Sequence, residues 1–306
     1  MRRVSTIGRR TSTSRWLSAV LGATVIVVLV GRLGADPFLQ ALSGATLPAL
    51  AAALAVGAGT TVLSALRWVR AARLLGLALP TVRALTDYYA ALFLNAVLPG
   101  GVLGDVRRAA LHGRDAGSMR RAAAALLLER SAGQLVLVVA AAALWVASPS
   151  AAPGPAPAWR AVVVALGAAA LAVAIGFARL LPPLRVRDAA ALLGASVAVL
   201  GGHVAMFVLA ARMAGVQISV AALLPLALVA LLAMSLPFNV AGWGPREGAT
   251  AWAFASVGLG AGQGVTVAVL YGLFALVAGL PGALVLLSRP RPAPTCVDGE
   301  RSMTPA

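Results

Sequence analysis

The chain has 306 residues, of which 60% are hydrophobic and 11% are charged, and its mean hydropathy is +0.92. Soluble domains contain roughly 25% charged residues, so this composition excludes a soluble globular protein and indicates an integral membrane protein. All 25 basic residues are arginine, and the formal net charge is +16. Because the arginines lie mainly between apolar runs, they indicate membrane topology and contact with anionic lipid rather than nucleic-acid binding.

The first expected element is a membrane span at residues 16–30, which follows a basic head of residues 1–15. We favour a retained span over a cleaved signal peptide, because the head is long and lacks a convincing small-residue cleavage site. A second span is expected at residues 45–66, and it is closed by Arg67, Arg70 and Arg73. The arginine bias places the N-terminus and segment 67–83 in the cytoplasm.

The next apolar piece, residues 84–98, is short and ends at an interruption. The residues that break it are Pro99, Gly100, Gly101 and Gly104. Arginines follow up to residue 121, so the piece starts and finishes on the cytoplasmic side. We therefore predict a re-entrant, broken-helix segment near residues 84–104, the alternative being a helix lying in the membrane interface.

Later spans are expected at residues 122–146, 161–178, 189–211, 221–236, 249–258 and 265–287. The uncharged, Pro-rich loop between the first two of these is expected outside the cell. A second helix break lies near residues 236–247 and contains Pro237, Gly242, Gly244 and Pro245. The sequence thus predicts an all-α polytopic membrane protein with about eight transmembrane helices in residues 16–288. Residues 289–306 form a polar tail that we expect to be disordered, with both termini cytoplasmic.

The two interruptions share a pattern: Leu-Pro, a glycine five positions after the proline, and arginine close behind. Transporters often contain repeats whose discontinuous helices meet at the midplane. The expected topology, however, puts both interruptions toward the cytoplasm, whereas an inverted repeat would put them on opposite faces. A duplication and this topology are therefore in conflict.

Backbone that Pro and Gly free from helical bonding cannot face lipid, so the breaks must be buried or line a polar cavity. After the first break, Asp105 is placed to cap a helix and to pair with Arg108 at i, i+3. After the second, Gly244 and Pro245 suit the N-cap and N1 positions. Helix starts with adjacent arginines bind phosphate or carboxylate groups.

Glu129 and Arg130 lie about two turns into an apolar run. Sequence neighbours on a helix do not face each other, so we expect Glu129 to pair with Arg246, or Arg130 with Glu247. The alternatives without a role in binding are a solvated basic loop for Arg107 and Arg108, and a structural ion pair within the bundle for Arg246 and Glu247. The full candidate set for substrate binding is Asn95, Asp105, Arg107, Arg108, Glu129, Arg130, Arg246 and Glu247.

Other polar and aromatic residues have plainer interpretations. His203 is expected to be a buried neutral histidine bonded to a neighbour, with a proton relay as the alternative. Trp68 and Tyr88 are interpreted as interface anchors. No metal-binding spacing, nucleotide-binding loop or cofactor motif is present, and the single Cys296 excludes a disulfide framework.

Three segments, LFLNAVLPGGVLGDVRRAALHGR, RRAAAALLLERSAGQ and SLPFNVAGWGPREGATAWAF, resemble the transmembrane region of the lysylphosphatidylglycerol synthase family. The family's motif residues fall here on Asn95, Pro99, Gly104, Asp105 and Arg108, then on Glu129 and Arg130, then on Gly242, Gly244 and Glu247. One departure is that Gly133 and Gln134 stand where the family commonly has an aspartate.

In full-length members of that family, this membrane region is joined to a soluble domain that transfers lysine from tRNA to phosphatidylglycerol, and the membrane part is held to move the product lipid between leaflets. The resemblance implies a stand-alone translocase of the cell membrane, flippase-like rather than an enzyme. It would hold an anionic phospholipid or lipid-linked intermediate in an intramembrane cavity, without a cofactor.

Two other functions stay open: a non-catalytic partner of a separate glycosyltransferase or lipid synthase, and an intramembrane enzyme with Asp105 or Glu129 as base. A homo-oligomer is also compatible with the sequence.

Overall fold

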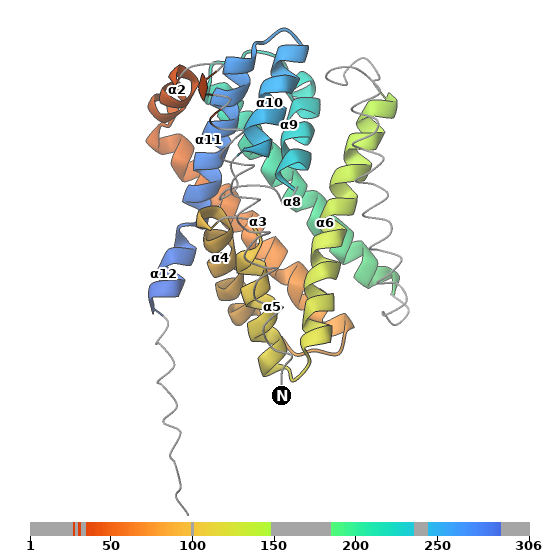
Figure 1. The fold of residues 1–306 in the computed structure, drawn as a ribbon. Helices are drawn as coiled ribbons and strands as arrows, with labels where there is room; N and C mark the ends of the chain where they lie inside the picture. The colour runs from red at the N-terminus through yellow and green to blue at the C-terminus, as the bar shows by residue number, and fades with distance from the viewer. Residues whose placement is uncertain are drawn as a thin grey trace, which may run out of the picture.

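The computed structural model describes residues 35–98, 101–147, 185–235 and 244–288, together with residues 27, 30 and 31. All regular secondary structure in these ranges is α-helical (Figure 1). Four helical stretches of this part of the chain are long and apolar enough to cross a membrane. They are α3 (Leu47–Leu74), α6 (Met119–Ala147), α8 (Val186–Met213) and the stretch formed by α11 (Ala261–Gly279) and α12 (Pro281–Ser288). An all-α polytopic membrane protein is thereby confirmed.

Several expected elements lie outside the described residues. They are the basic head of residues 1–15, most of the span at 16–30, the Pro-rich loop, the span at 161–178 and the tail of residues 289–306. Whether the chain crosses the membrane at residues 16–30 and 161–178 therefore stays a prediction. A short helix, α2 (Asp36–Gly44), precedes α3 and packs against α11.

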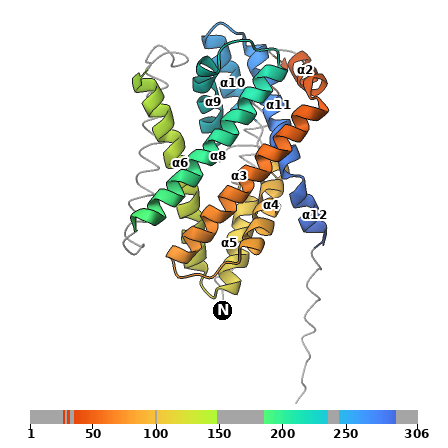
Figure 2. The ribbon, with the colours of Figure 1, turned by 180° about the vertical axis from the view of Figure 1, so that it is seen from behind.

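Small residues allow α3 to pack closely against α8 and α11. The buried side of α3 carries Ala49, Ala53 and Gly57 at four-residue intervals, which is one face of a helix. A Cβ atom at Gly57 would collide with Ala278 of α11. Without a hydrophobic force between helices in lipid, such close approach supplies the packing energy. Helices α3 and α8 also lie side by side, with Gly202 of α8 against Thr60 of α3, and they run in opposite directions (Figure 2).

The first interruption joins two short helices, α4 (Thr81–Val97) and α5 (Leu103–Asp115), into a hairpin. At 1.5 Å per residue these helices are roughly 26 and 20 Å long, shorter than a hydrocarbon core of about 30 Å. Both open ends of the hairpin lie at the end of the bundle where α3 finishes and α6 begins (Figure 1). The predicted broken-helix segment near residues 84–104 is confirmed.

The second interruption also belongs to a hairpin, made of α9 (Val220–Met234) and α10 (Pro245–Ser256). The expectation of separate crossings at 221–236 and 249–258 is wrong. Helices of 15 and 12 residues are too short to cross the membrane, and the chain returns to the end from which α9 starts. This hairpin enters from the end opposite to the first one (Figure 1). Placing both interruptions toward the cytoplasm was therefore also wrong.

The order long, short, short, long thus occurs twice, as α3 to α6 and as α8 to α11, with the second set reversed in direction (Figures 1 and 2). This is the arrangement of an inverted repeat. The conflict noted in the sequence came from counting crossings at 221–236 and 249–258. Because these segments form a hairpin instead, the two interruptions belong to hairpins from opposite ends, as an inverted repeat requires.

The contact between α4 and α5 yields a test of the first hairpin. A Cβ atom at Gly104 would collide with the backbone of Ala91 in α4. We expect Gly104→Ala to lower the free energy of unfolding by about 1–3 kcal/mol, the usual effect of overpacking, in thermal unfolding of the detergent-solubilised protein. Gly59→Ala on α3, where the space is open, serves as the control and should be neutral. Equal stability of both variants would contradict the close contact.

Candidate functional site

Five charged side chains from three helices meet where the first hairpin reaches the middle of the bundle. We call this group the central arginine cluster. Its members are Arg67 on α3, Asp105 and Arg108 on α5, and Glu129 and Arg130 on α6. Glu129 accepts hydrogen bonds at Oε1 from Arg67 Nε (3.2 Å) and at Oε2 from Arg108 Nη2 (2.8 Å). Arg108 Nε also donates to Asp105 Oδ1 (2.9 Å), and Arg130 pairs with Asp105.

The i, i+3 pair of Asp105 and Arg108 was predicted and is confirmed. The expected pairings of Glu129 with Arg246 and of Arg130 with Glu247 are wrong. Glu129 instead takes Arg67 and Arg108 as partners, and Arg130 takes Asp105. These buried carboxylates are thus neutralised by arginines of the first repeat.

Two aromatic rings enclose Arg108. Its guanidinium carbon lies 4.7 Å from the ring centre of Trp68 and 4.3 Å from that of Tyr88, within cation–π range. Both rings are buried, so their interpretation as interface anchors is wrong. The Tyr88 hydroxyl donates to Glu129 Oε1 (3.3 Å), and Ser196 of α8 accepts from Arg67 Nη1 (2.9 Å).

Asn95 closes the first break. Its Oδ1 accepts from the backbone N–H of Gly104 (2.7 Å), and its Nδ2 donates to Asp105 Oδ2 (3.1 Å). The capping bond expected of Asp105 is therefore made by Asn95, which lies near the end of α4. Asp105 lies in the first turn of α5, and its carboxylate pairs with Arg108 and Arg130. Gly101 of the break has φ 60°, a backbone conformation that favours glycine.

The central arginine cluster carries an excess of one positive charge, since three arginines share two carboxylates. The exposure of its members differs: Arg108 and Glu129 have no exposed surface, whereas the side chain of Arg130 is 48% exposed. Arg130 is roughly 17 Å along α6, near the middle of that helix. An exposed cation at mid-span needs water or an anionic partner.

The second break starts α10 with the residues expected. Gly244 is the N-cap at φ 112°, and Pro245 is N1. Glu247 reaches back to accept from the Gly244 backbone N–H (2.7 Å) and also accepts from Arg246 Nε (3.0 Å). Sequence neighbours thus do form an ion pair here, because both side chains lie in the first turn and fold over the helix start. Both are buried.

Arg246 is held against α11. Its guanidinium carbon lies 5.5 Å from the ring centre of Tyr271, and a Cβ atom at Gly272 would collide with its Nη2. Tyr271 also hydrogen-bonds to His203 Nδ1 through its hydroxyl (2.9 Å). His203 is therefore bonded to a neighbour, as expected.

Helix α6 connects the two breaks. Gln134 Nε2 donates to Ser235 Oγ (3.2 Å), which lies at the end of α9 next to the second break. A Cβ atom at Gly133 would lie 3.1 Å from Arg67 Nη1. The two residues that depart from the family pattern thus face different parts of the site. Gly133 makes room for Arg67 of the central arginine cluster, and Gln134 contacts the second hairpin.

The remaining candidates are less informative. Arg107 is half-buried on α5, beside Arg108 in the sequence. Pro99, Gly100, Pro237 and Gly242 lie outside the described residues. Among the residues that are described, no three His, Cys, Asp or Glu side chains gather as metal ligands do.

Sequence reasoning missed Arg67, which it assigned to a cytoplasmic loop. The available signal was the apolar sequence that continues after it: α3 extends to Leu74, so Arg67 lies about two turns inside the helix.

The sequence was also compared with known proteins. The sequence model of one protein family, described as Lysylphosphatidylglycerol synthase TM region, matches residues 15–282. The matched region runs from before the first described residue into α12, and it includes both hairpins and the central arginine cluster. Comparison with curated proteins found no match.

Pairing within the central arginine cluster predicts the effect of Glu129→Gln. This change removes the carboxylate that Arg67 and Arg108 share and leaves two buried guanidinium groups without it. We expect a loss of about 3 kcal/mol or more in the free energy of unfolding. Asp188→Asn, which breaks a more exposed pair with Arg70, is the matched control and should cost about 1 kcal/mol or less. Similar losses in denaturant titrations would argue against a structural role for the buried pairs.

Proposed function

The chain belongs to the lysylphosphatidylglycerol synthase TM region family, and from this membership and the central arginine cluster we propose that it binds an anionic lipid headgroup and carries it across the membrane. The substrate is a phospholipid or a lipid-linked intermediate with a phosphate or carboxylate group. The protein changes the side of the membrane on which this lipid lies and makes or breaks no covalent bond in it.

The observation that carries the proposal is the half-exposed Arg130 near the middle of α6. Within the cluster, Arg108 and Glu129 are fully enclosed, and only Arg130 combines an ion pair with a side chain that is 48% exposed. The excess positive charge of the cluster matches a single anionic group. Guanidinium groups bind phosphate and carboxylate through two parallel hydrogen bonds, which suits this role.

Crossing the membrane is slow for a lipid because its charged headgroup must leave water. A fixed positive charge at mid-span lowers that barrier, since the headgroup exchanges water for guanidinium contacts. In this proposal Arg108 and Arg246 hold carboxylates in place, and Arg130 contacts the headgroup. The cavity that would surround the headgroup stays a prediction, because residues of both breaks that would border it lie outside the described ranges.

The two hairpins supply the route. They enter from opposite ends of the bundle, and the helix ends that flank their breaks lie toward its middle (Figure 1). In this proposal the headgroup reaches the central arginine cluster along the first hairpin from one side and along the second hairpin from the other. Inverted repeats of this kind support alternating access around a fixed midplane site.

Arg130→Gln tests the proposal directly. The change leaves two arginines and two carboxylates, so the cluster becomes neutral, while Asp105 keeps Arg108 and Asn95 as partners. We expect the translocation of fluorescent phosphatidylglycerol in liposomes to slow by about tenfold or more, the effect of losing one charge-assisted hydrogen bond. The rate is measured by the fraction of label that an external quencher reaches with time.

Two controls accompany this experiment. Arg130→Lys keeps the charge and should retain part of the transport, and Arg121→Gln at the exposed start of α6 should transport like the unaltered protein. Wild-type transport by Arg130→Gln would overturn the proposal and leave a partner role for the protein. A change in headgroup chemistry in the lipid extract, without a change of leaflet, would instead indicate an intramembrane enzyme.

Gly272→Ala tests the second hairpin. The added methyl group collides with the flexible end of Arg246 rather than with backbone, so the guanidinium must move while the helices keep their contact. We expect thermal stability within about 1 kcal/mol of the unaltered protein, as for tolerated core changes, together with clearly slower lipid transport. Gly201→Ala on α8, which faces open space, is the control. If both variants transport equally well, the position of Arg246 does not matter to function.

A further inference from the structure

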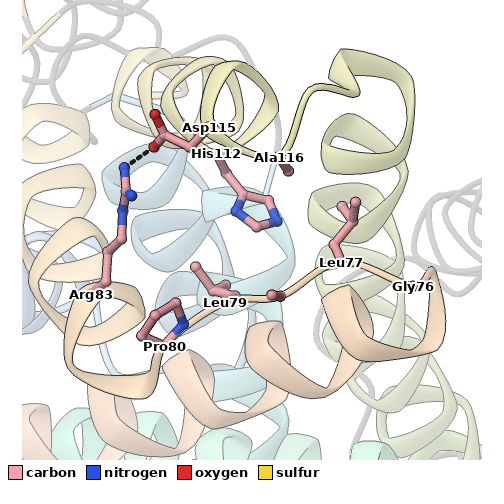
Figure 3. A pocket seen from close by; sticks show the side chains of 9 residues that line it. Gly76, Leu77, Leu79, Pro80, Arg83, His112, Asp115 and Ala116 are labelled. Atoms are coloured by element: carbon pink, nitrogen blue, oxygen red, sulfur yellow. Dashed lines mark hydrogen bonds and ion pairs between the residues drawn. The ribbon is translucent and has the colours of Figure 1, made fainter.

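A separate cavity of about 340 Å³ lies at the end of the bundle where α3 finishes and α6 begins, and none of its lining residues belongs to either break. It is formed by the loop between α3 and α4, the first turn of α4, and the last turn of α5 with Ala116 (Figure 3). Its polar side chains are Arg83, His112 and Asp115. None of these residues belongs to the candidate set discussed above.

His112 faces this cavity with an unused hydrogen-bonding atom. The residue is only 3% exposed, and its Nε2 has no hydrogen-bond partner in the part of the chain that the structure describes. Figure 3 shows the ring between Asp115 and Leu79, directed into the cavity. Burial and the neighbouring Arg83 lower the pKa of His112, so the ring is neutral near pH 7 and offers one N–H donor. A buried polar atom without a hydrogen-bond partner lowers the stability of the fold, and a bound ligand would supply the missing hydrogen bond.

The start of α4 adds donors beside His112. The first backbone N–H groups of an α-helix have no intrahelical acceptor, and at α4 the N-cap Pro80 makes no side-chain capping bond to them. Arg83 of this turn pairs with Asp115, and both side chains are more than 40% exposed. An ion pair this exposed contributes little stability, so an incoming anion can take the place of Asp115 on Arg83.

We propose that this cavity binds a phosphate group at the membrane surface, carried either by a lipid headgroup or by a small soluble polyol phosphate. Arg83, the start of α4 and His112 supply the hydrogen bonds, which is the donor set that phosphate prefers. The nearby carboxylates of Asp87 and Asp115 are both within 4 Å of Arg83 nitrogens, so they are balanced in part by that residue. The volume leaves room for a polyol beside the phosphate. Binding here does not depend on the proposed transport.

The cavity adjoins the central arginine cluster through aromatic contacts. The His112 ring meets the edge of Trp68 with ring centres 5.7 Å apart, and Trp68 in turn contacts Arg108. The rings of His112 and Trp68 thus lie between the cavity and Arg108 of the cluster.

Histidine labelling provides the test, because the chain contains only two histidines. We would label the full chain with ¹⁵N-histidine in maltoside micelles, which contain no phosphate, and follow both imidazole signals during titration with glycerol 3-phosphate or phosphatidylglycerol. The His112 Nε2 signal should move and saturate, while that of His203, bonded to Tyr271, stays in place. His112→Asn assigns the signals. A response to glycerol 3-phosphate indicates a soluble ligand, and a response to phosphatidylglycerol alone indicates a headgroup.

Two variants should act in opposite directions. Arg83→Gln removes a phosphate ligand and should raise the dissociation constant by about tenfold or more. Asp115→Asn removes the competing carboxylate and should lower it, whereas Arg121→Gln should leave it unchanged. The proposal is overturned if neither ligand moves the His112 signal, or if Arg83→Gln binds as well as the unaltered chain.

Discussion

A charged side chain inside hydrocarbon is tolerated only with a partner, and that constraint organises the first repeat. Glu129 on α6 is fully buried and bonds to Arg67 on α3 and Arg108 on α5. One carboxylate therefore joins three helices, and it fixes how deep the first hairpin enters the bundle. Arg108 is further held between Trp68 and Tyr88, so its position is determined by charge, hydrogen bonding and ring contact together.

The two hairpins share topology but differ in chemistry. In the first, the start of α5 is bonded by Asn95 from the preceding helix, and the surrounding charges sum to +1. In the second, Glu247 bonds the start of its own helix and neutralises its neighbour Arg246. Among the described residues, the charges around the first break therefore leave a positive excess, whereas the buried pair at the second break is neutral. Gln134 on α6, bonded to Ser235, connects the two breaks.

The helical membrane fold, both helix breaks and the pair of Asp105 and Arg108 could be predicted from the sequence, because apolar run length, Pro and Gly positions and i, i+3 spacing are local signals. The ion-pair partners of Glu129 could not, because they depend on which helices pack together. Arg67 was missed for the same reason: an arginine at a span end resembles a topology signal until a buried carboxylate is found beside it. The second hairpin was mistaken for two crossings because 221–236 is nearly long enough to span, and only its contact with α10 reveals the return.

The absence of lysine from this chain has a consequence for how a bound anion could leave. A guanidinium does not lose its proton under physiological conditions, so the cluster cannot discharge itself to free a ligand, as a buried ammonium could. Dissociation must come from rearrangement. If the protein carries a lipid as proposed, Asp105, already bonded to Arg130, is the internal anion that reoccupies this arginine when the headgroup departs.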